Sequence, residues 1–327
     1  MENVKTKNKV GIKNIAIDFS KRYPAVFIIL VLILAFTVVS PHFMTSSNAQ
    51  TIMAGNAVVM IAAIGETMVL LTGGIDLSVA TVISSSAVLA GYVMNVTHSI
   101  TLGILTAVAV GLVIGCINGL LIGYGKMVPF ITTMGTQLVA RGIAFVVSQG
   151  IAVKGTPKPL VEFGFQSLAG LPVIFLISIV LLLLSAVLIT KATWGRYVIL
   201  AGANKKTGQY TGINVRFVEM SVYVFAGLFA GIAGFISIIN LGNGIPGVGD
   251  TLLMIILGGV VLGGTSMNGG EGSIIRTLIG ITLLAILTNG LNIIGIPFYD
   301  QLIVQGILIF VGNGLAIYMS QKSEYAM

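Results

Sequence analysis

The chain has 327 residues, of which 56% are hydrophobic and only 8% are charged, and its mean hydropathy is +1.05. A water-facing surface needs roughly a quarter of its residues charged, so this composition excludes a soluble globular protein. The net charge of +7 follows from 17 basic and 10 acidic residues. The placement of these charges, described below, indicates membrane topology and not a nucleic-acid partner.

Apolar runs of about 20 residues recur along the chain, which is the length of an α-helix that crosses a hydrocarbon core of ~30 Å. Transmembrane β-strands would instead alternate in polarity over about ten residues. The sequence therefore predicts an all-α membrane protein with about ten transmembrane helices, of which the third and the eighth are short or broken. The predicted spans are 23–40, 52–71, 79–94, 100–123, 131–148, 171–190, 218–240, 251–263, 274–294 and 299–319.

The basic residues predict which side of the membrane each loop faces. With the N-terminus inside, 14 of the 17 fall on the cytoplasmic face, as the positive-inside rule requires. These are Lys5, Lys7, Lys9, Lys13, Lys21, Arg22, Lys126, Lys191, Arg196, Lys205, Lys206, Arg216, Arg276 and Lys322. We therefore expect a multi-pass protein of the cell membrane, with cytoplasmic tails at 1–22 and 320–327 and a transmembrane domain at 23–319.

The sequence lacks the motifs of nucleotide binding and hydrolysis. Gly125-Lys126 is followed by Met127, where a phosphate-binding loop needs Ser or Thr. Neither G-x-S-x-G nor H-E-x-x-H occurs, and the two histidines, His42 and His98, fall in predicted outer loops. We therefore expect no catalytic residue, no bound cofactor and no metal site in this chain.

Charged residues within or beside the spans need a partner, a cavity or an interface, since a charge at mid-bilayer costs about 2.5–3.5 kcal/mol on insertion scales. Glu219, Arg276 and Asp300 lie near span ends, where we expect them to anchor at the level of the lipid headgroups. Arg141 lies ten residues into the fifth span. We expect it to be either a structurally paired charge or part of a polar pathway.

Glycine is arranged in two helical faces. The first face repeats every four residues, at Gly111, Gly115, Gly119 and Gly123. The second face includes Gly227, Gly231 and Gly234. Faces without side chains let membrane helices approach closely and gain dispersion energy, so both predict dense helix packing.

Two glycine-rich breaks, 73–78 and 263–272, interrupt the apolar runs. Unwound backbone at membrane depth persists only where protein or a water-filled path satisfies it. Similarity between the apolar residues before each break weakly suggests an internal repeat.

The first break is a candidate functional element. Gly73 and Gly74 allow the chain to leave helical geometry, and Asp76 and Ser78 are typical N-cap residues. Asp76 either caps the following helix at the cytoplasmic boundary or belongs to an inner gate. Together with Arg141, these four residues are our candidates for the gate or pathway.

Seven ordered motifs, which span nearly the whole chain, resemble the permease subunits of ribose-type ABC importers. That family includes galactoside, xylose and autoinducer-2 permeases and, more remotely, branched-chain amino acid permeases. The motifs are Gly73-Gly74-Ile75-Asp76-Leu77-Ser78; Gly115-Cys116-Ile117-Asn118-Gly119; Pro129-Phe130-Ile131-Thr132-Thr133-Met134-Gly135 with Arg141-Gly142; Gly195-Arg196-Tyr197; Thr211-Gly212-Ile213-Asn214-Val215; Gly263-Gly264-Thr265-Ser266; and Asn289-Gly290-Leu291-Asn292.

The resemblance implies that this chain forms the pathway for a sugar or sugar-like solute. It implies a cytoplasmic ATP-binding cassette ATPase that holds the ATP, an extracytoplasmic substrate-binding protein, and a second permease copy or paralogue, all within membrane lipid. Two segments depart from the family pattern: Lys205-Lys206-Thr207, and Met254-Ile255-Ile256 with Gly258-Gly259.

The cytoplasmic loop 191–217 carries five basic residues and no acidic one. That charge alone is typical of any cytoplasmic loop, whereas the length of the loop and a turn at Gly212 favour a docking element for an ATPase. The residues that the resemblance assigns to this coupling are Gly202, Asn204, Gly212, Ile213 and Asn214.

Two other classes remain open from the residues. An ion-coupled secondary transporter would use Glu66 or Asp76 as a proton or sodium site. A membrane scaffold or receptor would move no solute. The source of energy separates the leading hypothesis from the secondary transporter.

Overall fold

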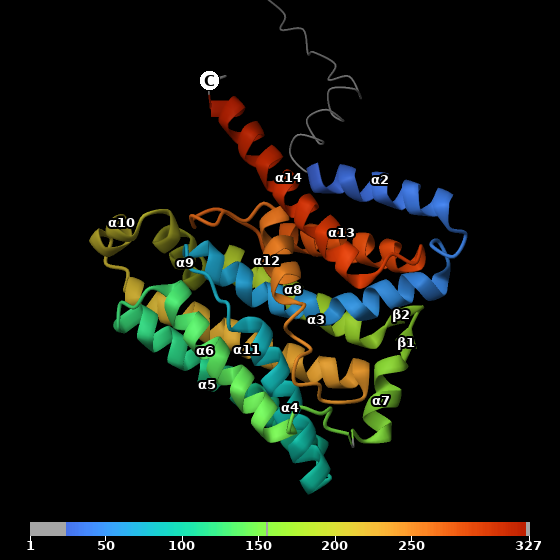
Figure 1. Cartoon of the computed structure of the whole chain (residues 1–327). Coiled ribbons are helices and arrows are strands. Elements are labelled where there is room, and N and C mark those ends of the chain that lie inside the picture. Colours follow the sequence, from blue (N-terminus) through green and yellow to red (C-terminus); the bar gives the residue numbers. More distant parts are fainter. Residues whose placement is uncertain (1–23, 155, 325–327) are drawn as a thin grey trace, which may run out of the picture.

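The computed structural model describes residues 24–154 and 156–324, and the predicted tail at 1–22 lies outside them. Among the described residues, seven helices are long and apolar enough to cross a membrane, and three shorter apolar helices accompany them. The prediction of an all-α membrane protein with about ten spans is confirmed. The ten helices (Figure 1) are α2 (Pro24–Val39), α3 (Ser46–Leu71), α4 (Val79–Thr97), α5 (Ile100–Gly119) continued by the π-helix η1 (Leu120–Tyr124), α6 (Pro129–Ser148), α8 (Val173–Lys191), α11 (Val215–Leu241), α12 (Leu253–Leu262), α13 (Ile274–Ile293) and α14 (Phe298–Glu324).

The core of the bundle is built around α3 and α11. Every residue of α3 from Asn56 to Leu71 is buried, as expected for a helix that other helices surround on all sides. α11 packs against α3, α4 and α5. α5 and α8 instead expose many large apolar side chains, which suits helices that border lipid.

The predicted glycine face of α5 packs against Gly227 and Gly231 of the second face, whereas Gly234 packs against α4. Gly111 of α5 lies on the backbone of Gly227 and Gly231 of α11, and a Cβ at Gly115 would come within 2.6 Å of the Tyr223 carbonyl oxygen. The remaining contacts of the stripe are Gly119 with the backbone of Met220 and Gly123 with the backbone of Arg216. The prediction of close packing is confirmed, because side chains at these positions would force the two helices apart.

α12 has only ten residues, a length of about 15 Å, and is too short to cross the bilayer alone. The span predicted at 251–263 is therefore a half-helix. The chain reaches it through residues 242–252, which leave the end of α11 and turn back along α4. We call residues 242–252 the re-entrant segment.

The backbone of the re-entrant segment is satisfied by protein groups, as membrane depth requires. Gly244 exchanges two backbone hydrogen bonds with Val153, of 2.9 and 3.0 Å. Farther on, the Gly249 N–H donates to the Ser84 hydroxyl (2.8 Å), and Gly249 lies directly on the Ala80 carbonyl of α4. The segment thus runs along α4 from the loop at Val153 toward the first turn of that helix.

Short elements lie at the two ends of the bundle. One end carries α7 (Lys158–Phe165) and a hairpin of β1 (Ser167–Leu168) with β2 (Leu171–Pro172), paired antiparallel with Leu168 opposite Leu171. The other end carries α9 (Thr193–Ala203) and α10 (Lys205–Tyr210) (Figure 1). The loops predicted on opposite sides of the membrane thus lie at opposite ends of the molecule.

Candidate functional site

Both glycine-rich breaks begin with the same turn, the Schellman motif. The helix α3 is followed by Gly73 at a φ of 75°, and α12 is followed by Gly264 at a φ of 85°. The bonds that close the two turns are Gly73 N–H to Leu70 O (2.8 Å) with Gly74 N–H to Val69 O (3.2 Å), and Gly264 N–H to Val261 O (2.8 Å) with Thr265 N–H to Val260 O (3.3 Å). The sequence similarity before the breaks therefore corresponds to a shared backbone turn.

The two breaks lie against each other and against the end of α9. The Gly270 N–H donates to the Leu71 carbonyl oxygen (2.9 Å). Gly202 of α9 rests on both partners of this bond, since a Cβ there would overlap the Leu71 oxygen and lie 2.6 Å from the Gly270 nitrogen. A Cβ at Gly269 would lie 2.7 Å from the nitrogen of Gly73. We call these five residues the glycine junction.

Asp76 belongs to a chain of buried hydrogen bonds that joins four segments. Its N–H donates to Glu66 Oε1 (3.2 Å), and its Oδ1 accepts from the Ser78 N–H (2.8 Å) and the Ser78 hydroxyl (2.5 Å). The Asn118 amide of α5 donates to the Ser78 hydroxyl (2.9 Å), and the Thr136 hydroxyl of α6 donates to Asn118 Oδ1 (2.7 Å). We call these five residues the break network.

The expectation that Ser78 caps α4 with its side chain is wrong. Ser78 occupies the N-cap position, but its hydroxyl makes no capping bond and is engaged by Asp76 and Asn118 instead. Although Asp76 follows α3 in the sequence, it does not extend beyond the end of that helix. Its hydrogen bond to Glu66 places it beside the last turns of α3. The first break thus folds back along α3 into the bundle.

The neighbouring Tyr223 leaves no room for a side chain at Gly74. A Cβ at Gly74 would overlap the hydroxyl oxygen of Tyr223 on α11. That hydroxyl and Glu66 Oε2 are buried and have no hydrogen-bond partner among the described residues. Glu66 belongs to the break network, and Tyr223 lies beside it at Gly74.

Arg141 forms an ion pair with Asp250 of the re-entrant segment, with 2.9 Å between Nη2 and Oδ2. Its guanidinium also lies over the ring of Phe145, one turn farther along α6, at 5.7 Å from the ring centroid. The sequence predicts that Arg141 is either a structurally paired charge or part of a polar pathway. The structure shows the ion pair. Sequence reasoning missed Asp250, although the glycines that surround it predict the irregular backbone that brings it to α6.

The five residues assigned to ATPase coupling have different surroundings. Asn204 caps α10 by accepting the Thr207 N–H (3.0 Å), and Asn214 caps α11 by accepting the Phe217 N–H (3.1 Å). Gly212 has a φ of 81°, as the predicted turn requires. Gly202 lies in the glycine junction, away from this turn.

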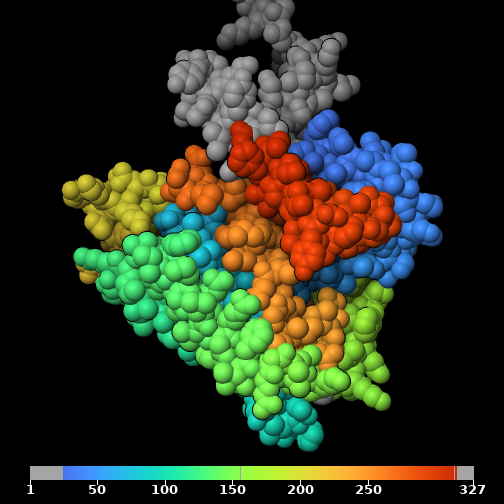
Figure 2. All heavy atoms as spheres, viewed as in Figure 1, coloured from blue at the N-terminus to red at the C-terminus, as the bar shows by residue number. Residues whose placement is uncertain are grey.

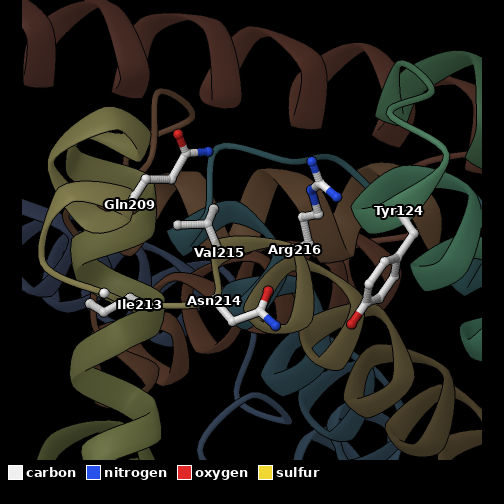
Figure 3. A pocket seen from close by; sticks show the side chains of 7 residues that line it. Tyr124, Gln209, Ile213, Asn214, Val215 and Arg216 are labelled. Atoms are coloured by element: carbon white, nitrogen blue, oxygen red, sulfur yellow. The ribbon is translucent and has the colours of Figure 1, made fainter.

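A hollow of about 460 Å³ opens beside this turn. Figure 3 shows Ile213 and Tyr124 on opposite sides, with Asn214 and Arg216 between them. Three of the predicted coupling residues, Gly212, Ile213 and Asn214, line it together with the end of η1. The hollow is thus formed by the loop and by the neighbouring helix end.

Glu219, which we expect to anchor near the lipid headgroups, has a partner within the protein. It pairs with Lys205, with 2.5 Å between Nζ and Oε1, and its side chain is largely covered. Lys205 is the first residue of α10, so the ion pair joins α10 to the beginning of α11.

Residues 48–312 match the family model described as the permease component of the branched-chain amino acid transport system. The chain belongs to this family. It is a family of transport permeases and not of enzymes, and its members, this chain included, are integral membrane proteins. No solved structure matches the chain.

Curated relatives of this permease cover nearly its whole length. The ribose import permease protein RbsC of Bacillus subtilis (strain 168) is 36% identical over 90% of this chain and 91% of its own. The protein of the same name from Escherichia coli (strain K12) is 33% identical over 90% and 92%. The L-arabinose transport system permease protein AraH of Escherichia coli (strain K12) is 29% identical over 88% of each. The predicted relationship to sugar permeases is confirmed.

Proposed function

We propose that this chain forms the translocation pathway of an ABC importer for a sugar or sugar-like solute. An extracytoplasmic binding protein delivers the solute, and ATP hydrolysis on separate cytoplasmic subunits drives its passage through a pair of permease chains. Both termini are then cytoplasmic, and the loop 191–217 couples to the ATPase. The observation that carries this proposal is the likeness to ribose permeases over nine-tenths of the chain.

The geometry of the loop supports the coupling role. The hollow beside Gly212 lies at the end of the bundle that carries α9 and α10, where it is open to a cytoplasmic partner. Away from the hollow, the glycine junction connects α9, the helix that precedes α10, to both breaks. A partner bound at the loop would therefore act on the backbone at Gly73 and Gly269 through Gly202.

The source of energy tests the proposal. The chain is reconstituted in liposomes with its ATPase and binding protein, and uptake of radiolabelled ribose is measured. We expect uptake that requires ATP and persists when an ionophore collapses proton and sodium gradients. Uptake that needs no ATP and stops with the ionophore would reject the proposal in favour of an ion-coupled carrier that uses Glu66 or Asp76.

Gly212→Val is expected to lower ribose uptake and substrate-stimulated ATP hydrolysis together, at least fivefold, while the chain still inserts in the membrane. The φ of 81° costs a residue with a side chain about 1–2 kcal/mol, which distorts the turn that lines the hollow. Gly170→Val is a matched control, since Gly170 has a φ of 82° and equally open surroundings at the opposite end. Normal coupled hydrolysis in Gly212→Val would contradict the docking role.

A further inference from the structure

The ion pair between Arg141 and Asp250 is half-exposed at membrane depth. Arg141 lies about 18 Å from the start of α6 and about 10 Å from its end, at 1.5 Å per residue. The side chains of Arg141 and Asp250 are 49% and 32% exposed. A charge at this depth is not tolerated toward lipid, so it must face water or another protein surface.

The pair joins α6 to the re-entrant segment, and these two elements share one face of the molecule. Figure 2 shows the re-entrant segment and α12 (orange) on this face, bordered by α6 (green). Leu138, one turn before Arg141 on α6, is 65% exposed, and Phe145, one turn after it, is partly exposed. Gly247 of the re-entrant segment approaches the ring of Phe145, with 3.9 Å between its Cβ position and Phe145 Cζ.

We propose that Arg141, Asp250 and Phe145 form a contact site for a hydroxyl-rich solute in a water-filled pathway. This inference rests on the proposed function and names the residues that the solute touches. The guanidinium donates hydrogen bonds and the carboxylate accepts them, so the pair satisfies adjacent hydroxyl groups that both donate and accept. The aromatic ring supplies an apolar surface for the C–H face of a sugar.

The ion pair would also make the binding of the solute weak. In the absence of solute, the guanidinium and the carboxylate satisfy each other, so a sugar must compete with an existing charge-assisted bond. Because Asp250 lies in a turn of the re-entrant segment and Arg141 lies on a helix, a shift of that segment along α4 would open the pair. A pathway needs this property, since tight binding would prevent release.

Accessibility to water tests the site without knowledge of the solute. In a chain whose one cysteine is removed by Cys116→Ala, we compare Leu138→Cys with Leu184→Cys on α8, which is similarly exposed at 63%. A charged methanethiosulfonate reagent in intact membranes should modify Leu138→Cys at least tenfold faster, because only a hydrated thiol ionises. Equal, slow modification of both would overturn the proposal.

Transport tests the chemistry of the site. In the reconstituted complex with its ATPase and binding protein, Asp250→Asn should reduce ribose uptake per ATP hydrolysed at least tenfold. The exchange Arg141→Asp with Asp250→Arg restores an ion pair, so it should recover the thermal stability that Arg141→Ala loses, but not the uptake. Wild-type uptake in the Arg141→Asp, Asp250→Arg double variant, or undiminished uptake in Asp250→Asn, would show that the ion pair has only a structural role. Either result would overturn the proposal.

The two proposals fail in distinguishable ways. A wild-type complex without ATP-driven uptake, in which Leu138→Cys still reacts rapidly, would contradict the importer function and retain a hydrated site at Arg141. A wild-type complex with ATP-driven uptake and unreactive Leu138→Cys would retain the function and reject this site.

Discussion

Gly202→Ala is expected to destabilise the folded protein by about 1–3 kcal/mol, even though alanine is the better helix former. A single methyl group at this position would overlap the Leu71 carbonyl oxygen and press on the Gly270 nitrogen. The hydrogen bond between those two groups would then stretch or break, and overpacking of this kind typically costs 1–3 kcal/mol. The loss is measured as the thermal unfolding temperature and the monodisperse yield in detergent.

Gly306→Ala is the matched control for this prediction. Gly306 lies within α14, and the space around its Cβ position is open. Replacement of a helical glycine by alanine there should leave the stability unchanged or raise it by up to about 1 kcal/mol. Only Gly202→Ala should therefore lower the unfolding temperature. A Gly202→Ala protein as stable as Gly306→Ala would show that Gly202 does not contact Leu71 and Gly270 in the membrane.

Asp76→Asn is expected to abolish ribose uptake, with a loss of more than tenfold, while the assembled complex keeps its thermal stability. Asparagine retains the Oδ1 oxygen that accepts both bonds from Ser78, so the resting break network persists. It lacks the negative charge and the second acceptor oxygen of the carboxylate. If the first break is a gate that shifts as the ATPase domains close, the second carboxylate oxygen of Asp76 accepts a hydrogen bond in the shifted conformation. Asparagine would lose that bond.

Asp76→Ala separates this role from capping. It removes both bonds to Ser78 and leaves buried donors without partners, at a cost of about 1–3 kcal/mol for each group. We expect it to lower both stability and uptake. Wild-type uptake in Asp76→Asn, with loss only in Asp76→Ala, would show that Asp76 merely caps the helix that follows.

Helical spans and close packing could be predicted from the sequence because they follow from local composition. A run of apolar residues in lipid forms an α-helix, because the helix satisfies its own backbone hydrogen bonds. A glycine every four residues leaves one face of that helix without side chains, whatever the helix packs against. The positive φ of Gly212 was predicted for the same reason, since the turn is determined by its own residues.

Contacts between distant segments could not be predicted in this way. Gly202 meets Gly270 across 68 positions of the chain, and nothing in either motif shows its partner. Asn118 and Thr136 carry ordinary polar side chains whose part in the break network depends on the fold of the first break. Asp250 lay at the edge of a predicted span, where the sequence cannot show that the chain turns back into the membrane.

The packing of α5 on α11 has a consequence for how force crosses the membrane. Two helices in backbone contact have no side-chain rotamers between them that could absorb a displacement, so the pair is stiff along its axis. α11 begins directly after Asn214 and extends for about 40 Å to Leu241, where the re-entrant segment starts. A displacement of the loop 191–217 would therefore be transmitted along α11 to its other end and move the segment that carries Asp250, without any change in the helices between.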